Sequence, residues 1–308
     1  MCESNHVIKI RSFSKCDLVA AYERRHGIDV SGCLTTDFLD LFCCEACDVR
    51  FFSPPSTGDV AFYRALSKLK GYYMEEKAEF WIARKMIVPG NRVLEIGGGQ
   101  GGFAGQLEGV DYVGLEFNDE AVESARARGV RILNEPLEQH VLNNRAGYDV
   151  VCAFQVLEHI ALPRQMLQNA LACLKPGGRL ILSVPSHDSF LKAAPNLVLN
   201  MPPHHVTLWS DRALLGLGGT FGCKVEDLVH EPIAPYHLPW FMATTLLSFT
   251  DKQYRTAPVL DLGAGMRLKY FLASVVGYVF SIVLRPIVAR MDADFAVRGH
   301  AVVIALRK

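Results

Sequence analysis

The sequence lacks an excess of either charge and lacks a long apolar run. Its 308 residues contain 32 lysines plus arginines and 32 aspartates plus glutamates, so the formal net charge is zero. General electrostatic binding to nucleic acid needs a cationic face that displaces counterions, so this balance argues against a nucleic-acid partner. No apolar stretch reaches the roughly 20 residues that a bilayer-spanning helix needs. We therefore expect no nucleic-acid partner and no transmembrane helix.

The sequence also shows no secretory signal and only one close cysteine pair. Residues 1–6 contain no basic-then-apolar segment, and nine cysteines without such a segment indicate reduced thiols in a cytoplasmic protein. Cys44 and Cys47 form one CxxC, whereas a zinc ribbon needs four ligands, usually from two such pairs. Cys16 and Cys33 lie upstream but do not form a second pair. Buried free cysteines are the commoner outcome, so we predict no metal site.

What the sequence does have is a glycine-rich turn after an apolar strand. Residues 93–96 are apolar except for Glu95, and five glycines follow within six positions, before the predicted helix start at residues 103–107. Glycine adopts positive φ and has no Cβ, so a ligand can lie against bare backbone N–H groups at such a turn. The predicted cofactor contacts in this segment are Glu95, Gly97, Gly98, Gly99 and Gly101.

Two nucleotide-binding patterns overlap in this turn. Gly97, Gly99 and Gly102 satisfy GxGxxG, the dinucleotide pattern, which is a weak signal alone. Glu95 adds an acidic residue two positions earlier, and a carboxylate would repel a pyrophosphate. It suits a ligand with an amino group, such as the methionine end of S-adenosylmethionine. A second strand ends at Glu116, whose carboxylate can accept hydrogen bonds from two ribose hydroxyls in either kind of ligand.

Further segments resemble those of a known family. Residues 148–160 form a strand with a Leu-Glu-His exit, and residues 174–185 contain a Lys-Pro-Gly-Gly turn before another strand. With the glycine turn and Glu116, they resemble the class I S-adenosylmethionine-dependent methyltransferases over residues 90–230, and most closely the ubiquinone-biosynthesis branch. An NAD(P)-dependent oxidoreductase and a non-catalytic, cofactor-binding scaffold protein remain as alternatives.

The resemblance implies a fold and a cofactor. The expected fold is α/β, a doubly wound, Rossmann-like seven-stranded sheet with an antiparallel last strand, and the expected cofactor is S-adenosyl-L-methionine. The family often places an acidic adenine contact after the third strand; here Pro136 takes that position, so the backbone near Leu137, or Glu138, is predicted instead. Because ligands bind at the carboxyl ends of such strands, Phe117, Phe154 and Gln155 complete the predicted cofactor site.

We divide the chain into four parts. Residues 1–57 form an N-terminal extension with the partial CxxC, residues 58–232 the methyltransferase core, residues 233–296 an apolar helical insertion and residues 297–308 the last strand. Within the core, residues 58–87 have helical spacing. Tyr72, Tyr73 and Lys77 in this stretch either cap the cofactor pocket or belong to a helix packed on the sheet edge.

Three histidines are the predicted catalytic residues. His159 lies in the loop after the fourth strand, where ubiquinone-type O-methyltransferases can hold a divalent cation with Glu-x-x-Glu-His; Gln155 replaces the first Glu, so we expect no metal. His204 and His205 follow two prolines, which restrict the backbone. A neutral imidazole at this position could deprotonate an acceptor hydroxyl. The alternative is that these histidines only hydrogen-bond a loop.

The insertion contains two apolar, helix-like runs at residues 238–249 and 270–284, with basic residues flanking the second. A lid or homodimer interface and a peripheral membrane contact through residues 238–290 both explain such a surface. The expected acceptor is a hydroxyl oxygen on a small molecule, a glycan or a lipid-linked compound.

Overall fold

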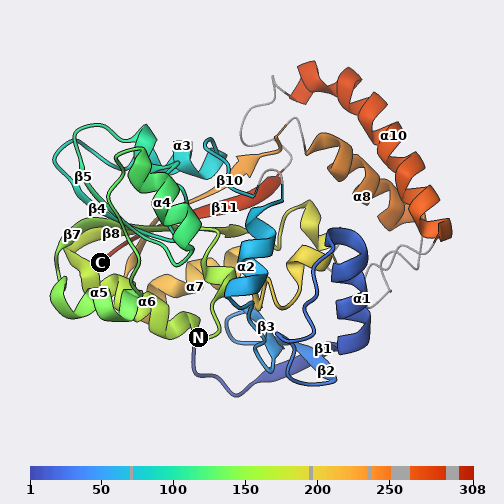
Figure 1. Cartoon of the computed structure of the whole chain (residues 1–308), viewed down its shortest axis with the longest axis horizontal. Coiled ribbons are helices and arrows are strands. Elements are labelled where there is room, and N and C mark those ends of the chain that lie inside the picture. The colour runs from blue at the N-terminus through green and yellow to red at the C-terminus, as the bar shows by residue number, and fades with distance from the viewer. Residues whose placement is uncertain (70–71, 194–196, 235–236, 251–263, 289–297) are drawn as a thin grey trace.

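The computed structural model describes residues 1–69, 72–193, 197–234, 237–250, 264–288 and 298–308 (Figure 1). A seven-stranded sheet crosses its centre in the order β10-β11-β8-β7-β4-β5-β6, and β11 runs antiparallel to both of its neighbours. This order confirms the predicted doubly wound sheet with an antiparallel last strand. The strands are β4 (Arg92–Ile96), β5 (Asp111–Leu115), β6 (Ile132–Leu133), β7 (Tyr148–Phe154), β8 (Leu174–Pro185), β10 (Lys224–Pro232) and β11 (Arg298–Arg307).

The central strands are nearly continuous apolar runs because helices cover both faces of the sheet. Val93 and Val150 pack in the cluster that includes α3, whereas their neighbours Leu94 and Val151 pack with α5, α6 and α7. Val122 and Ala125 of α4 pack on Ile132. The helices are α3 (Ala78–Arg84), α4 (Asp119–Ala127), α5 (Leu137–Asn143), α6 (Pro163–Cys173) and α7 (Asp211–Phe221).

Two helix predictions around the glycine turn are wrong. A single 3-10 turn, Ala104–Gln106, replaces the helix expected to start at Phe103. Only eight residues separate Gly102 from the start of β5, too few for a helix and a return to the sheet. The predicted helical stretch 58–87 is likewise broken into α2 (Val60–Ser67) and α3, because the chain between them crosses the glycine turn. A Cβ on Gly102 would lie 3.2 Å from the Met74 carbonyl oxygen.

The N-terminal residues form a second, four-stranded antiparallel sheet that the sequence did not reveal. Its order is β1-β2-β3-β9, and β9 comes from the loop that follows β8 in the other sheet. Its core includes Leu18, Tyr22, Phe52 and Phe62. Its elements are β1 (Val7–Ser14), α1 (Lys15–His26), β2 (Phe38–Cys44), β3 (Arg50–Ser53) and β9 (Thr207–Leu208). The N-terminal sheet is therefore joined directly to the loop that carries His204 and His205.

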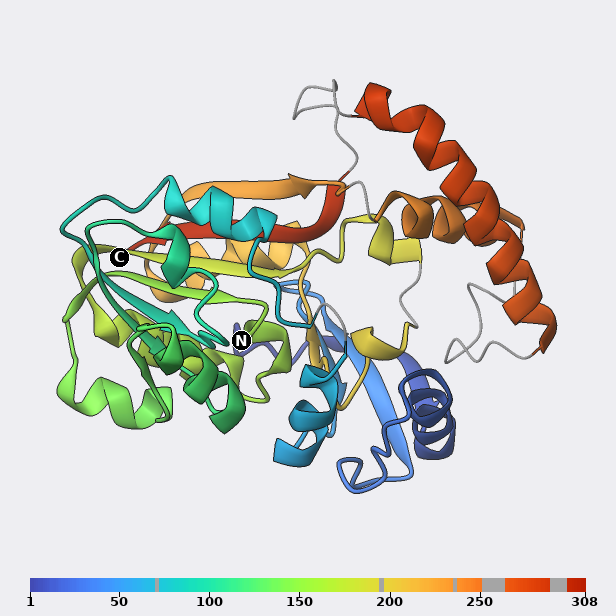
Figure 2. The same ribbon diagram turned by 45° about the horizontal axis from the view of Figure 1, so that its top comes forward.

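The apolar insertion contains two helices that pack on each other beside the main sheet, α8 (Leu238–Thr250) and α10 (Ala264–Val288) (Figure 2). Both predicted helices are confirmed, although α10 has 25 residues and extends beyond the predicted run at both ends. Residues 235–236, 251–263 and 289–297 of the predicted insertion and its end lie outside the described residues.

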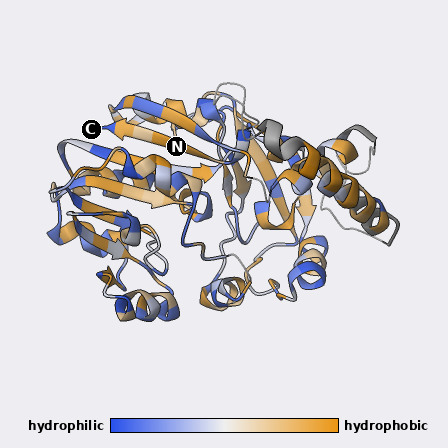
Figure 3. Ribbon diagram, turned by 90° about the horizontal axis from the view of Figure 1, so that it is seen from above, coloured by the Kyte–Doolittle hydropathy of each residue, from blue (hydrophilic) through white to orange (hydrophobic). Residues whose placement is uncertain are grey.

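Small residues of α10 face α8, and large apolar residues face outward. A Cβ on Gly277 would lie 2.8 Å from the Pro239 carbonyl oxygen, so the two helices are in close contact there, and Ala273 is buried. Hydrophobic colouring runs along the described part of this helix (Figure 3). Its exposed apolar side chains include Leu268, Phe271, Leu272, Val275, Val276, Tyr278, Val279, Phe280, Ile282 and Val283.

Among the described residues, no helix is both long enough and apolar enough to cross a membrane.

Candidate active site

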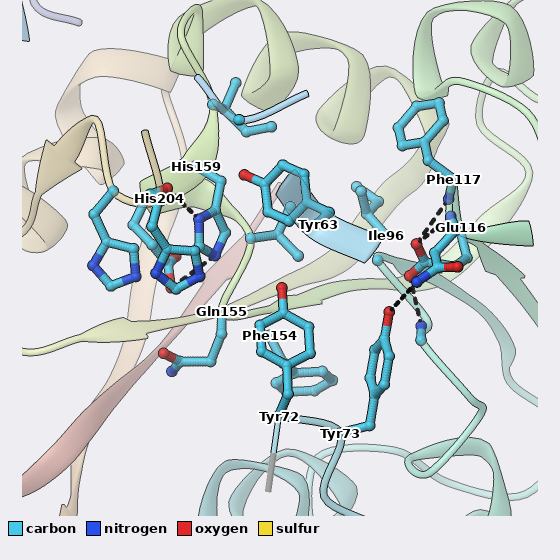
Figure 4. A pocket seen from close by; sticks show the side chains of 18 of the residues that line it. Tyr63, Tyr72, Tyr73, Ile96, Glu116, Phe117, Phe154, Gln155, His159 and His204 are labelled. Carbon is cyan, nitrogen blue, oxygen red and sulfur yellow. Dashed lines mark hydrogen bonds and ion pairs between the residues drawn. The ribbon is translucent and has the colours of Figure 1, made fainter. Parts of the chain in front are cut away.

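A single cavity of about 1540 Å³ runs from the glycine turn to the loops that follow β7 and β8. Figure 4 shows Glu116 and Phe117 at one end and His159 and His204 at the other, with Tyr63 between them. The cavity therefore has a glycine and carboxylate half and a histidine half. Both halves lie at the carboxyl ends of the central parallel strands, where doubly wound sheets bind their ligands.

The glycine turn is shaped so that its backbone is accessible from the cavity. Gly97, Gly99 and Gly101 have φ values of 77°, 51° and 80°, which glycine adopts without strain. A Cβ on Gly97 would lie 2.5 Å from Val156 Cγ2, and one on Gly99 would lie 3.1 Å from Tyr73 Cε1. Gly97, Gly98 and Gly99 line the cavity; Gly101 packs against Val130 instead and is not part of the lining.

Glu95 is a buried carboxyl group beneath this turn, with 2% of its surface exposed, and it lines the cavity. The Tyr112 hydroxyl donates a hydrogen bond of 2.5 Å to Glu95 Oε2. Burial raises the pKa of Glu95 to about 7, although the Tyr112 bond lowers it. A carboxyl group with this pKa becomes fully ionised when a cationic ligand group lies beside it.

Glu116 is held by three backbone donors at the carboxyl end of β5. Gly99 N–H donates to Oε2 at 2.9 Å, and Phe117 and Asn118 N–H donate to Oε1 at 2.8 and 2.9 Å. The Asn118 amide also donates to the Tyr73 hydroxyl at 3.2 Å. These bonds orient the carboxylate toward the cavity, where it can accept hydrogen bonds from a pair of ligand hydroxyls.

Four more predicted cofactor contacts lie around this half of the cavity, and all of them line it. Phe117 is 67% exposed, whereas Leu137 at the start of α5 is buried. The Phe154 ring packs on Phe103 with centroids 4.7 Å apart. Gln155 has a φ of 56° and its side-chain amide donates to Ser183 Oγ at 3.1 Å. The acidic neighbour Glu135, which the sequence did not indicate, also lines the cavity.

The segment 72–77 crosses this half, in agreement with the capping hypothesis. Tyr72, Tyr73 and Lys77 all line the cavity, and none of them lies in a helix. Tyr73 reaches Asn118 beyond the glycine turn, so the tyrosine segment covers the space between the turn and β5.

The three predicted catalytic histidines meet at the other end of the cavity, although His159 lies 45 residues before His204. Ring centroids are 4.5 Å apart for His159 and His204, 5.0 Å for His159 and His205, and 4.4 Å for His204 and His205. One ring nitrogen from each lies within 4.8 Å of the others. A cluster of this kind can accept a proton or hold a transition-metal ion.

Hydrogen bonds assign the tautomers of two of these rings. His159 Nδ1 lies 2.6 Å from the His204 carbonyl oxygen, and His204 Nδ1 lies 2.9 Å from the Leu199 carbonyl oxygen. A carbonyl only accepts, so both Nδ1 atoms carry the proton and both Nε2 atoms keep a lone pair. Within the described residues, His204 Nε2 and His205 Nδ1 are buried and have no hydrogen-bond partner.

Burial keeps the cluster neutral. It lowers the pKa of His159 to about 4 and lowers the pKa values of His204 and His205 well below the usual value. Glu158 is also buried, and burial raises its pKa to about 8. Its Oε1 lies 3.8 Å from His159 Nε2. Gln155, which replaces an acidic residue of the family motif, bonds Ser183 and brings no second carboxylate to this cluster.

Several residues of the histidine half could not be found from the sequence. Tyr63 of α2 packs edge-on against His159 with centroids 6.0 Å apart. Glu231, His237 and His300 line the same cavity. Glu231 and His300 lie on either side of the insertion in the sequence, and His237 lies near its start. In the sequence, only the pairing of β10 with β11 could have indicated these three residues, because that pairing brings the two ends of the insertion together.

Comparisons with known proteins agree with this geometry. A family model described as a methyltransferase domain matches residues 66–228, just over half of the chain. The ubiquinone biosynthesis O-methyltransferase of Vibrio parahaemolyticus is 31% identical over 126 residues, which cover 38% of this chain and 51% of that protein. Its counterpart from Cronobacter sakazakii is 31% identical over 126 residues, 37% of this chain and 52% of that protein. The chain spans about half the length of the curated relatives it matches.

A solved structure shows the same fold. The crystal structure of a SAM-dependent methyltransferase from Archaeoglobus fulgidus superposes with a TM-score of 0.51 at 14% identity, covering 80% of this chain and all of that one.

Proposed function

We propose that this chain, which belongs to the family of class I S-adenosylmethionine-dependent methyltransferase domains, methylates a hydroxyl oxygen of an acceptor that reaches the histidine cluster. The observation that supports this proposal is the continuous cavity that joins the glycine turn and Glu116 to His159, His204 and His205. Donor and acceptor can therefore meet inside one continuous cavity, and their alignment is most of what methyl transfer asks of a protein.

The glycine half fits the cofactor. When bound, S-adenosylmethionine supplies a methyl group on a positively charged sulfur. Glu95 would hold the amino group, Glu116 the two ribose hydroxyls and Leu137 one face of the adenine. The backbone of the glycine turn has positive φ values, and Val156 lies close to Gly97. Because these glycines have no Cβ, the turn still leaves room for a ligand.

The histidine half would receive the acceptor proton. The hydroxyl gives its proton to a neutral imidazole nitrogen as its oxygen bonds the methyl carbon, and the bond from that carbon to sulfur breaks. Burial keeps His159, His204 and His205 unprotonated near neutral pH and ready for this role. Glu158, 3.8 Å from His159 Nε2, would stabilise the imidazolium only in its ionised form, which the positive charge of that imidazolium favours.

We further propose that the acceptor is lipid-linked and is presented at a membrane surface. The histidine half of the cavity is lined by Leu197, Val198, Leu199 and Trp240, so an acceptor with an apolar part fits it. Trp240 belongs to α8, and α8 packs on the apolar, outward-facing α10. The relatives named above make a small-molecule acceptor the competing proposal, and a glycan acceptor is the third.

Calorimetric titration with S-adenosylhomocysteine and, separately, with NADH tests the cofactor assignment. We expect binding of S-adenosylhomocysteine alone. Binding of NADH alone would support an oxidoreductase. If S-adenosylhomocysteine binds but no hydroxyl acceptor is methylated in screens of lipid, phenol and glycan substrates, the scaffold alternative gains support.

Co-sedimentation with vesicles of phosphatidylcholine and phosphatidylglycerol tests the membrane proposal. We expect the wild-type chain to sediment and the double variant Val275→Asp/Val279→Asp to stay in solution. Leu142→Asp is the matched control, because Leu142 is an exposed leucine on α5. A wild-type chain that never sediments contradicts the proposal, and a dimer in light scattering that the double variant abolishes would assign the same face to a second copy.

A further inference from the structure

The turn between β2 and β3 has a geometry suited to binding a cation through sulfur. Cys44 N–H donates to the Val49 carbonyl at 3.0 Å, and Asp48 N–H donates to the Cys44 carbonyl at 2.8 Å. Asp48 has a φ of 61°, so the chain reverses sharply just after Cys47. This tight turn places the Cys44 and Cys47 sulfur atoms on the same side of the hairpin.

A third sulfur comes from a distant part of the sequence. Cys2 Sγ lies 3.4 Å from Cys44 Sγ, and the sulfur atoms of Cys2, Cys44 and Cys47 all lie within 4.8 Å of one another. Arg164 of α6 holds the segment that carries Cys2: its guanidinium donates to the Met1 carbonyl and lies 3.3 Å from Glu3 Oε1. The cluster could not be read from the sequence, because Cys2 belongs to no recognisable motif.

Backbone donors surround the two hairpin sulfurs. The Ala46 and Cys47 backbone N–H groups donate to the Cys44 sulfur, and Val49 N–H donates to the Cys47 sulfur. Ionising all three sulfurs at this spacing would cause strong repulsion unless a cation lay between them.

We propose that Cys2, Cys44 and Cys47 bind one zinc ion through three thiolates, with water in the fourth position. Zinc binds thiolate sulfur at about 2.3 Å in a tetrahedral arrangement, so its sulfur ligands lie roughly 3.8 Å apart. The three sulfurs therefore need only small side-chain adjustments. Cys2 and Cys47 are partly exposed, so water has access to the remaining position.

The site connects the N-terminal sheet to the catalytic domain. Ser210 Oγ donates to Asp48 Oδ2 at 2.5 Å, and the Arg212 guanidinium donates to the Glu45 and Ala46 carbonyls at 3.1 and 3.0 Å. Ser210 caps α7 directly after the loop that carries His204 and His205. A zinc ion that fixes the hairpin would therefore also fix one end of this loop.

The test is zinc content and zinc affinity of the full chain, purified under reducing conditions without oxygen. We expect about one zinc per chain in the wild type and in Cys16→Ser, the control with an exposed cysteine outside the cluster. Cys44→Ser and Cys47→Ser should lose the metal. Cys2→Ser should weaken zinc binding by more than the roughly 10- to 100-fold typical of an outer-shell partner. Replacing zinc with Co²⁺ should produce thiolate-to-cobalt absorption that Cys2→Ser alters.

Three outcomes would overturn the proposal: a folded, reduced chain that takes up no zinc, a Cys2→Ser variant with wild-type zinc affinity, or a Cys2–Cys44 disulfide in place of the metal. Cys2 lies outside every helix and strand, so its variant remains informative even if Cys44→Ser does not fold. Titration of Cys2→Ser with S-adenosylhomocysteine separates this test from the proposed activity, since the zinc site lies away from the residues assigned to the cofactor.

Discussion

The two halves of the cavity are built in opposite ways. The glycine half comes mainly from one stretch of chain, from Glu95 through Glu116 to Leu137, which residues 72–77 cover and Phe154 and Gln155 complete. The histidine half combines Tyr63, His159, His204 and His300, which belong to four distant segments. The first half is polar and partly exposed, whereas the second is buried and holds its titratable groups neutral. The glycine half therefore depends mostly on the local chain, whereas the histidine half depends on how separate segments pack.

The largest expected effect is on turnover in the histidine half. His159→Gln and His204→Gln should each lower kcat by about 10²- to 10⁴-fold, the usual contribution of a positioned acid or base. Binding of S-adenosylhomocysteine should stay near the wild-type value. Steady-state kinetics and calorimetry measure the two quantities, and His6→Ala, an exposed histidine, is the control. If turnover is unchanged in both variants, the histidines only hold the loop.

A smaller but clear effect is expected on cofactor binding in the glycine half. Glu116→Ala removes the carboxylate that we expect to accept hydrogen bonds from the two ribose hydroxyls. It also leaves three backbone N–H groups without their hydrogen-bond acceptor. Hydrogen bonds to a charged group contribute about 1.5–3 kcal/mol each, so S-adenosylhomocysteine should bind at least about a hundredfold more weakly. Calorimetry measures the loss, and Glu123→Ala on the exposed side of α4 is the control. Near-wild-type binding by Glu116→Ala would contradict the ribose assignment.

The smallest expected effect concerns the pH dependence of stability. Because burial raises the pKa of Glu158 to about 8 from a usual 4.5, the folded chain keeps a proton that the unfolded chain releases. This contribution is complete below about pH 4.5 and is lost as the pH rises to about 8, with a slope of at most about 1.4 kcal/mol per pH unit. Glu158→Gln cannot titrate, so this part of the slope should disappear from urea unfolding curves.

Glu108→Gln, an exposed carboxyl, should leave the slope as it is. An unchanged slope in Glu158→Gln would mean that Glu158 is ionised in the folded chain. The buried histidines act in the opposite direction: burial lowers the pKa of His159 to about 4, so its contribution to stability is lost as the pH falls from about 6.5 to 4.

Local patterns correctly predicted the strands of the main sheet that carry the glycine half. Apolar runs predicted β4, β5, β7, β8 and β11, because parallel strands covered on both faces have few polar residues. Asn118, a residue type preferred at helix N-termini, caps α4, and its side chain accepts from Glu120 N–H at 3.1 Å. Such features depend on neighbours in the sequence, so they can be recognised without the fold.

Predictions failed where packing overrides local preference. Helical spacing over residues 58–87 gave no sign that the chain would cross the glycine turn at Met74. The N-terminal sheet was missed because its last strand, β9, comes from beyond β8. Cys2 was overlooked for the same reason: its closeness to Cys44 depends on the path of the first residues across the domain.

The sequence by itself determined the sheet, the family and the glycine turn, since these follow from hydrophobic period, glycine positions and two carboxylates within a short stretch. Only the tertiary structure decided which histidines meet, which titratable groups are buried, and that three cysteines gather at the hairpin. Those properties arise from contacts between residues far apart in the chain, and their energies depend on burial, which local sequence does not specify.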